Sequence, residues 1–246
     1  MPAGTKHAGR LHGHCFRCGF KAWPDSEEEV MHCLTERTTR HGRDTLSEPA
    51  RSLWHQCRSL AGDGLAYLLA RGCAVPPADA DLRWLPALRH PPSAMRYPAL
   101  VALVTDAVTG EAMTLHRTWV RFDGEKAPVA PARMLLGGHR KAGGVIRLWP
   151  NEAVGAGLGV AEGIETALSM AHALQPVWAC IDAGNLAAFP VLPGIEALTI
   201  AADNDLAGRG AADSCARRWH AAGREVRIVM APTERTDLND VARAAA

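Results

Sequence analysis

The acidic residues whose spacing best suits catalysis lie in the last part of the chain, each at the end of a short apolar run. The run LGVAE ends on Glu162, and Gly163 and a helical pattern follow it directly. The run ALTIAAD ends on Asp203, with Asp205 and a glycine-containing helix start behind it. Ligands of open α/β sheets gather at the carboxyl ends of the strands. We therefore expect Glu162, Asp203 and Asp205 to meet at one edge of a sheet.

Two carboxylates in an Asp-x-Asp pattern form a natural seat for Mg²⁺ or Mn²⁺, because hard cations prefer oxygen ligands. Crowded carboxylates repel each other unless a cation or a shared proton is present. Asp237 and Asp240 follow a fourth apolar run and extend the acidic set. The alternative is that residues 203–205 merely cap the next helix. Their pairing with a strand that ends in Glu162 favours a metal-binding, catalytic edge.

The elements that must position these acids alternate regularly. The near-continuous apolar runs are typical of a buried parallel sheet with right-handed crossovers. We expect strands at residues 158–162, 177–182, 197–203 and 225–231. Helices are expected at residues 164–174, around 186–189, at 207–222 and in a terminal turn-helix. The sequence predicts one α/β domain over residues 153–246.

The part of the chain before this domain is basic. Residues 1–152 hold 20 Lys and Arg against 15 Asp and Glu, whereas residues 153–246 hold 7 against 11. The segment from residue 126 to 151 has no acid and five cations: Lys126, Arg133, Arg140, Lys141 and Arg147. A basic segment before an acidic one suits an enzyme that grips a polyanion and also holds cations. The alternative is a chance asymmetry.

Glycines flank the basic tip of residues 134–149, which reads MLLGGHRKAGGVIRLW. Glycine lets the backbone approach a ligand closely. The spacing is not that of a P-loop, so no ATPase motor is predicted. The segment is interpreted as a basic hairpin that contacts phosphate, with a plain turn as the alternative.

Upstream, a helical pair at residues 47–72 with a break at Gly62 is expected to act as scaffold. Residues 76–98 are rich in proline and are expected to be irregular. Strands at 99–106 and 113–122 form a hairpin or meander. In the second strand, alternation places Arg117 beside Trp119, which suits a nucleic-acid groove or an ordinary solvated face.

The N-terminal residues contain HGHCFRCG, in which Cys15 and Cys18 form a CxxC pair. This is half of a tetrahedral zinc site. The pattern does not identify the other two ligands, and candidates lie on both sides of the pair: His7, His12, His14, His32 and Cys33. The alternative is a vestigial or inert pair.

The composition is that of a globular protein, with 48% hydrophobic and 22% charged residues. No apolar run reaches the roughly 20 residues of a membrane span, and no signal-peptide pattern opens the chain. Seven scattered cysteines argue against a secreted disulfide scaffold. We expect a soluble protein of the reducing cytoplasm that does not enter a membrane.

The segments AEGIETAL, AADNDLAGRGAA and DLND resemble the Toprim domains of phage- and plasmid-type DNA primases. The preceding segments ALVALVTDAVTGEAMTLHRTWV, DGEKA, MLLGG and GGVIRL resemble the region before Toprim in those enzymes. HCFRCG is similar to the second half of the primase zinc ribbon. The resemblance implies a partial zinc finger and linker at 1–43, a helical pair and basic β-rich subdomain at 44–152, and a Rossmann-like Toprim domain at 153–246.

The resemblance also implies a function, namely synthesis of short RNA primers on single-stranded DNA from nucleoside triphosphates with Mg²⁺. Glu162 would match the family's general acid/base, Asp203 and Asp205 its metal pair, and Asp237 and Asp240 looser metal ligands. The residues expected to hold template or nucleotide are Arg117, Lys126, Arg140, Lys141 and Arg147.

This sequence departs from the family in lacking a Cys pair upstream of Cys15. Either His7 or His12 substitutes, the start lies too late, or the finger has decayed. No helicase motor follows, so a separate replicative helicase is expected. The alternatives are a Toprim nuclease and a non-catalytic single-strand-binding accessory. A topoisomerase is disfavoured, because Tyr67 and Tyr97 are the only tyrosines and no second domain positions them.

Overall fold

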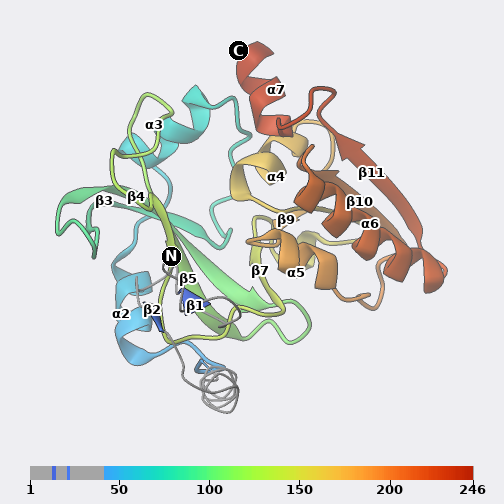
Figure 1. Cartoon of the computed structure of the whole chain (residues 1–246), viewed down its shortest axis with the longest axis horizontal. Coiled ribbons are helices and arrows are strands. Elements are labelled where there is room, and N and C mark those ends of the chain that lie inside the picture. Colours follow the sequence, from blue (N-terminus) through green and yellow to red (C-terminus); the bar gives the residue numbers. More distant parts are fainter. Residues whose placement is uncertain (1–12, 15–20, 23–41, 246) are drawn as a thin grey trace, which may run out of the picture. The chain divides into compact units, whose positions relative to one another are not determined.

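The computed structural model describes residues 13–14, 21–22 and 42–245 (Figure 1). The chain forms two compact units, Met1–His41 and Gly42–Ala246. In the first unit, β1 (Gly13–His14) pairs antiparallel with β2 (Lys21–Ala22). Cys15 and Cys18 lie outside the described residues, so the zinc site stays a prediction.

The second unit opens with the expected helical pair, α2 (Glu48–Gln56) and α3 (Gly62–Ala70). Pro49 stands in the first turn of α2, where its missing N–H costs no helical hydrogen bond. Gly62 begins α3 with a φ of 50°, a left-handed conformation that glycine adopts without strain. The two helices therefore begin where the sequence indicates.

An antiparallel meander follows, made of β3 (Leu82–Arg89), β4 (Arg96–Asp106), β5 (Ala112–Trp119) and β6 (Arg133–Leu135). Strand β4 pairs with β3 and β5, and β5 pairs with β6. The expectation of an irregular segment at 76–98 is wrong over β3. The register of β3 shifts between Leu85 and Leu88. Pro86 falls in this irregularity, where a residue without an N–H does not break the ladder.

Strand β7 (Gly144–Arg147) joins the two parts of the sheet, pairing antiparallel with β4 on one side and β9 on the other. The predicted glycine-flanked hairpin is wrong, because β6 pairs with β5 and not with β7. All four residues of β7 are buried. A fully buried strand needs a hydrogen-bonding partner on each side, and β4 and β9 supply them.

The C-terminal part contains the four predicted parallel strands, and the structure arranges them in the order β11-β10-β8-β9. The outermost strand differs from the expectation of full burial, since Ile228, Val229 and Met230 are exposed. In Figure 1, α6 and β11 lie at the side of the sheet far from α2. In chain order the elements are the short 3₁₀ helix η1 (Asn151–Ala153), β8 (Gly157–Ala161), α4 (Ile164–Met170), β9 (Val177–Ala179), α5 (Ala183–Ala188), β10 (Ala197–Ala202), α6 (Leu206–Ala221), β11 (Glu225–Met230) and α7 (Leu238–Ala245).

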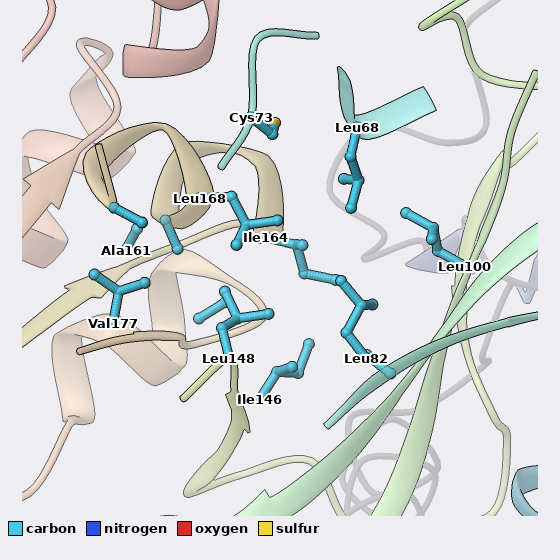
Figure 2. Packing of buried hydrophobic residues seen from close by; sticks show 14 of the residues in the cluster. Leu68, Cys73, Leu82, Leu100, Ile146, Leu148, Ala161, Ile164, Leu168 and Val177 are labelled. Carbon is cyan, nitrogen blue, oxygen red and sulfur yellow. The ribbon is translucent and has the colours of Figure 1, made fainter. Parts of the chain in front are cut away.

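One hydrophobic cluster spans both parts of the second unit. Figure 2 shows its upstream members on one side and its downstream members on the other, with Ile164 between them. The upstream side includes Leu68, Leu82 and Leu100; the downstream side includes Ala161, Leu168 and Val177. The two parts therefore share one core and hold each other in place. Among the described residues, no helix has both the length and the apolar character needed to cross a bilayer.

Candidate active site at the carboxyl edge of the parallel sheet

The acids predicted to be catalytic follow neighbouring strands. Glu162 stands directly after β8, and Asp203 directly after β10. These strands are parallel partners, with Ala161 opposite Ala201. Both acids therefore lie at the same edge of the sheet. We call this edge, with Glu162, Asp203 and the neighbouring carboxylates, the acidic edge.

The carboxyl groups at this edge act on one another electrostatically. Burial and the charges of Asp203, Asp205 and Asp182 raise the pKa of Glu162 to about 7. Burial and the charges of Asp237 and Asp205 raise the pKa of Asp203 to about 6. The structure thus brings the predicted acids into one region of concentrated negative charge.

Two of the three residues 203–205 make structural bonds, and one of these bonds is the helix cap that the alternative expects. Asp205 is the N-cap of α6 and accepts a hydrogen bond from the amide of Gly208 at 2.7 Å. The Asn204 side chain donates to the carbonyl of Ala231 at 2.9 Å. Asp203 differs, because its Oδ1 is buried and has no partner among the described residues. A buried carboxylate oxygen without a donor is costly, and a cation would relieve that cost.

Asp237 and Asp240 begin helix α7 with reciprocal bonds. The amide of Asp240 donates to Asp237 Oδ1 at 2.9 Å, and the amide of Asp237 donates to Asp240 Oδ2 at 3.1 Å. Thr166 in α4 donates to the second oxygen of Asp237 at 3.3 Å. Asp237 is half-buried and acts on Asp203, whereas Asp240 is exposed. Of the two, Asp237 is the acid that faces the edge.

The carboxylate oxygens at the acidic edge are suitable ligands for a divalent cation. The group combines an orphaned oxygen on Asp203 with raised pKa values on Glu162 and Asp203. A cation would lower both pKa values, and hard cations take oxygen ligands. Within residues 42–245, however, no three acidic, His or Cys side chains already form a complete ligand cluster. The carboxylates lie in the same region, and their side chains would have to adjust to bind a cation together.

Glu165 is a further acid of this site, which the sequence-based prediction missed. It lies one helical turn after Glu162, is 6% exposed, and accepts hydrogen bonds from Tyr67 (2.8 Å) and Arg133 (3.1 Å). Burial opposes its ionisation, but Arg133, Lys126 and the Tyr67 bond hold its pKa at about 2. The only signal in the sequence is the second acid of EGIE. The sequence spacing of Glu165 does not indicate that its hydrogen-bond donors come from α3 and β6.

Two cations lie beside the acids. Burial and the charge of Arg133 lower the pKa of Lys126, while the charges of Glu165 and Asp237 oppose that shift. Arg133 makes an ion pair with Glu165 at 3.1 Å. The site therefore holds positive and negative side chains next to each other.

The basic tip of residues 139–141 is held by carboxylates. Arg140 pairs with Asp106 at 3.0 Å and with Asp44 at 3.0 Å. Lys141 pairs with Asp182 at 2.6 Å, and the charge of Asp182 acts on Glu162. The tip is thereby drawn toward the acidic edge.

Arg117 and Arg147 are buried instead. Arg117 donates to the carbonyl of Leu135 at 3.1 Å and lies 5.4 Å from the ring of Trp119, which is itself fully buried. The expected choice between a nucleic-acid groove and a solvated face is wrong here, because packing covers this strand face. Arg147 lies 4.6 Å from the Trp178 ring and donates to backbone carbonyls. Both guanidinium groups make structural bonds.

A pocket of about 210 Å³ opens beside the acidic edge. It lies between the antiparallel strands and the start of α4. Its walls combine apolar side chains with charged and polar ones: His116, Arg133, Met134, Leu135, Ile146, Gly163, Ile164, Glu165, Ile181 and Asp182.

Family models cover most of the second unit. Residues 157–246 match a model described as a Toprim domain, and residues 44–148 match one described as a domain of unknown function (DUF7146). The chain matches none of the curated proteins.

Two solved primase structures are similar to this chain. The primase fragment of the bacteriophage T7 primase-helicase protein superposes with a TM-score of 0.50 at 16% identity, over 95% of this chain and 86% of the T7 chain. A DNA primase domain from Pseudomonas aeruginosa superposes with a TM-score of 0.42 at 15% identity, over 89% and 70%. At such identities the T7 likeness concerns the fold. Residues 157–246 are therefore a Toprim domain, and the chain has the fold of the T7 primase fragment.

Proposed function

We propose that this protein is a DNA primase-type nucleotidyltransferase that makes short RNA primers on single-stranded DNA. The observation that carries the proposal is a group of carboxylates with cations beside it: Asp203 interacts with Glu162, Asp237 and Arg133, and Lys126 interacts with Asp237 and Glu165. A nucleoside triphosphate needs both, because cationic side chains bind phosphate and carboxylates bind the accompanying metal.

In the proposed reaction, a ribonucleotide 3′-hydroxyl attacks the α-phosphate of a nucleoside triphosphate. An O–P bond forms, pyrophosphate leaves, and the hydroxyl proton must move to a base. Glu162 suits this role, because its carboxylate lies at the same edge as Asp203 and can accept a proton. Its pKa is raised to about 7 without a cation, and a bound cation would lower that pKa and keep Glu162 ionised as a base. Mg²⁺ or Mn²⁺, when bound, would neutralise phosphate charge. The residues that would hold it are Glu162, Asp203, Asp205 and Asp237, with Asp240 a more distant candidate.

The proposed partners follow from the same reaction. Single-stranded DNA is the template, and nucleoside triphosphates are the substrates. The T7 relative is a primase-helicase protein; for this chain we propose a separate replicative helicase. Cys15 and Cys18 remain proposed zinc ligands.

The decisive experiment incubates the protein with single-stranded DNA, labelled ribonucleotides and Mg²⁺ or Mn²⁺. We expect oligoribonucleotides from the wild type and none from Asp203→Asn. The matched control is Asp213→Asn, an exposed acid of α6 away from the edge, which should keep full activity. Cleavage of the DNA without synthesis would make the protein a Toprim nuclease. DNA binding with neither reaction would make it a non-catalytic accessory, and either result overturns the proposal.

A further inference from the structure

Asn239 in α7 is a buried polar residue that takes no part in the proposed reaction. It is fully buried, and its amide bonds to residues of two other helices. Its Nδ2 donates to the carbonyl of Arg71 at 2.8 Å and to Oγ of Ser169 in α4 at 3.1 Å. Its Oδ1 accepts a 2.7 Å hydrogen bond from Nε of Arg71, the C-cap residue of α3. These bonds fix the orientation of the amide, because Nε of Arg71 can only donate.

Arg71 joins α7 to a turn of the antiparallel part. It is 8% exposed, and its Nη1 donates to the carbonyl of Gly124 at 3.1 Å. Gly124 has a φ of 82°, and a Cβ there would lie 3.0 Å from Cβ of Ala70, so the turn packs tightly against the end of α3. Glycine suits this position because it adopts a left-handed φ and allows a close neighbour. One guanidinium group therefore holds the turn at residue 124 and the start of α7 together.

The two segments that Arg71 joins carry charged groups of the proposed site. Lys126 follows Gly124 by two residues, and Asp237 precedes Asn239 by two residues. Two residues of extended chain span at most about 7 Å, so both charged residues lie close to the Arg71 bridge. Burial lowers the pKa of Lys126, and the charge of Asp237 is among those that oppose this shift, so the two side chains lie within electrostatic range. The spacing between this cation and this carboxylate therefore depends on Arg71.

We propose that Arg71 and Asn239 are positioning residues that hold the cation Lys126 at the right distance from the proposed metal ligand Asp237. The inference rests on the proposed function and names residues that act on it without touching the substrate. A cation that binds a triphosphate and a carboxylate that binds its metal must be correctly spaced, and a displacement of about 1 Å can cost roughly a hundredfold in rate. Without the Arg71 bridge, phosphate and metal each keep their own ligands, but these ligands no longer have the right separation.

The test measures the binding of metal and phosphate, separately and together. The probes are Mg²⁺ alone, inorganic tripolyphosphate in EDTA, and tripolyphosphate with saturating Mg²⁺, each titrated by calorimetry. We expect the wild type to bind tripolyphosphate about tenfold more tightly with Mg²⁺ than without it, and we call this ratio the metal-dependent gain. Arg71→Met keeps the length of the side chain, removes all its donors and should abolish most of the gain. It should change the affinities for Mg²⁺ alone and for tripolyphosphate alone by less than about twofold.

Two conservative variants keep the test decisive if Arg71→Met does not fold. Arg71→Lys can donate to only one of the two acceptors that the guanidinium group reaches, so it should lose part of the metal-dependent gain. Asn239→Asp still accepts from Nε of Arg71 and should retain most of the gain.

Two controls separate positioning from a general loss of stability. Trp178→Phe removes a buried hydrogen bond to the carbonyl of Trp149, outside the proposed site, and should keep the full metal-dependent gain. Glu125→Gln removes the exposed ion pair of Glu125 with Arg243, a second contact between the same turn and α7. It should also keep the full gain, because exposed ion pairs contribute little to stability.

The proposal is overturned if the wild type shows no metal-dependent gain, or if Arg71→Met (Arg71→Lys, where the first variant does not fold) keeps the full gain. It is equally overturned if Trp178→Phe loses as much of the gain, because the effect would then be one of stability. Weaker binding of tripolyphosphate without Mg²⁺ to the same extent would make Arg71 a phosphate ligand and also overturn it. Normal primer synthesis by Arg71→Met would contradict this inference alone. Loss of the gain in a protein that makes no primers would contradict the proposed function alone.

Discussion

The phenol of Tyr67 in α3 donates a 2.8 Å hydrogen bond to the buried carboxylate of Glu165 in α4. Arg133, at the start of β6, reaches the same carboxylate oxygen at 3.1 Å. One ionised group thus joins a helix, a strand of the antiparallel part and the first helix of the Toprim domain. Because Glu165 lies one turn after Glu162, this cluster also fixes the helix behind the acidic edge.

Removal of the Glu165 charge should destabilise the fold. We expect Glu165→Ala to lower the free energy of unfolding by about 1–3 kcal/mol, because the buried Tyr67 hydroxyl loses its acceptor, whereas Arg133 is exposed and regains water. Tyr67→Phe should cost about 1.5–3 kcal/mol, the range for a hydrogen bond to a charged group, since one of the two donors to this oxygen is lost. Denaturant titration at pH 7 measures both values.

The cost of Glu165→Gln should depend on pH in a defined direction. The folded pKa of Glu165 is lowered from 4.5 to about 2, so its ionic stabilisation is complete above about pH 4.5 and is lost as the pH falls toward 2. The difference in unfolding free energy between wild type and Glu165→Gln should therefore shrink between pH 5 and pH 3. An unchanged difference over that range would show that Glu165 stabilises by shape alone.

Gly208 should be essential for the position of Asp203. A Cβ at residue 208 would lie 2.4 Å from the carbonyl oxygen of Asp203, which is a backbone clash. We expect Gly208→Ala to displace Asp203, to lower stability by about 1–3 kcal/mol and to weaken Mg²⁺ binding. Gly210→Ala is the matched control, because a Cβ there meets nothing within 4 Å and alanine favours the helix. Thermal unfolding with and without Mg²⁺ compares the two, and equal behaviour would refute the explanation.

Divalent cations should stabilise the protein more at high pH than at low pH. The pKa values of Glu162 and Asp203 are raised to about 7 and about 6. Ionisation of both groups therefore costs the folded state stability as the pH rises from about 4 to 7. Mg²⁺ should reverse that loss, giving a larger rise in melting temperature at pH 8 than at pH 5. In Asp203→Asn the stabilisation by Mg²⁺ itself should largely disappear at both pH values, and its persistence there would locate the cation elsewhere.

Lys126 and Arg147 belong to one basic segment but should behave differently on mutation. Lys126→Ala should weaken nucleotide binding about tenfold with little change in stability, because its ammonium lies near the acidic edge. Arg147→Ala should lower the free energy of unfolding by about 1–3 kcal/mol, because the buried carbonyl of Ala107 loses its donor and the Trp178 ring loses the guanidinium packed against it. Calorimetric binding and denaturant titration on both variants test this. The reverse pattern would mean that the basic segment acts as one nucleic-acid surface.

The strand ends were predictable because two local rules coincide there. Buried parallel strands read as apolar runs, and the residue after each run lies at the ligand-binding edge. Glu162 and Asp203 satisfy both rules. Strand β3 was not predictable, because Pro86 signals an irregular segment and only pairing with β4 shows that it sits at a register shift.

The parallel α/β part, the order of its strands along the chain and the acids that end them can be read from the sequence, because they depend on patterns within a few residues. Which charged residues face the site depends on how distant segments pack together. Arg147 and Lys126 look alike in sequence, yet one is buried beside Trp178 and the other lies near Glu165. The same holds for Tyr67, Glu165 and His116, whose partners or lack of partners depend on strands and helices distant in the chain. Burial and pairing across such distances are set by packing, and no local pattern encodes them.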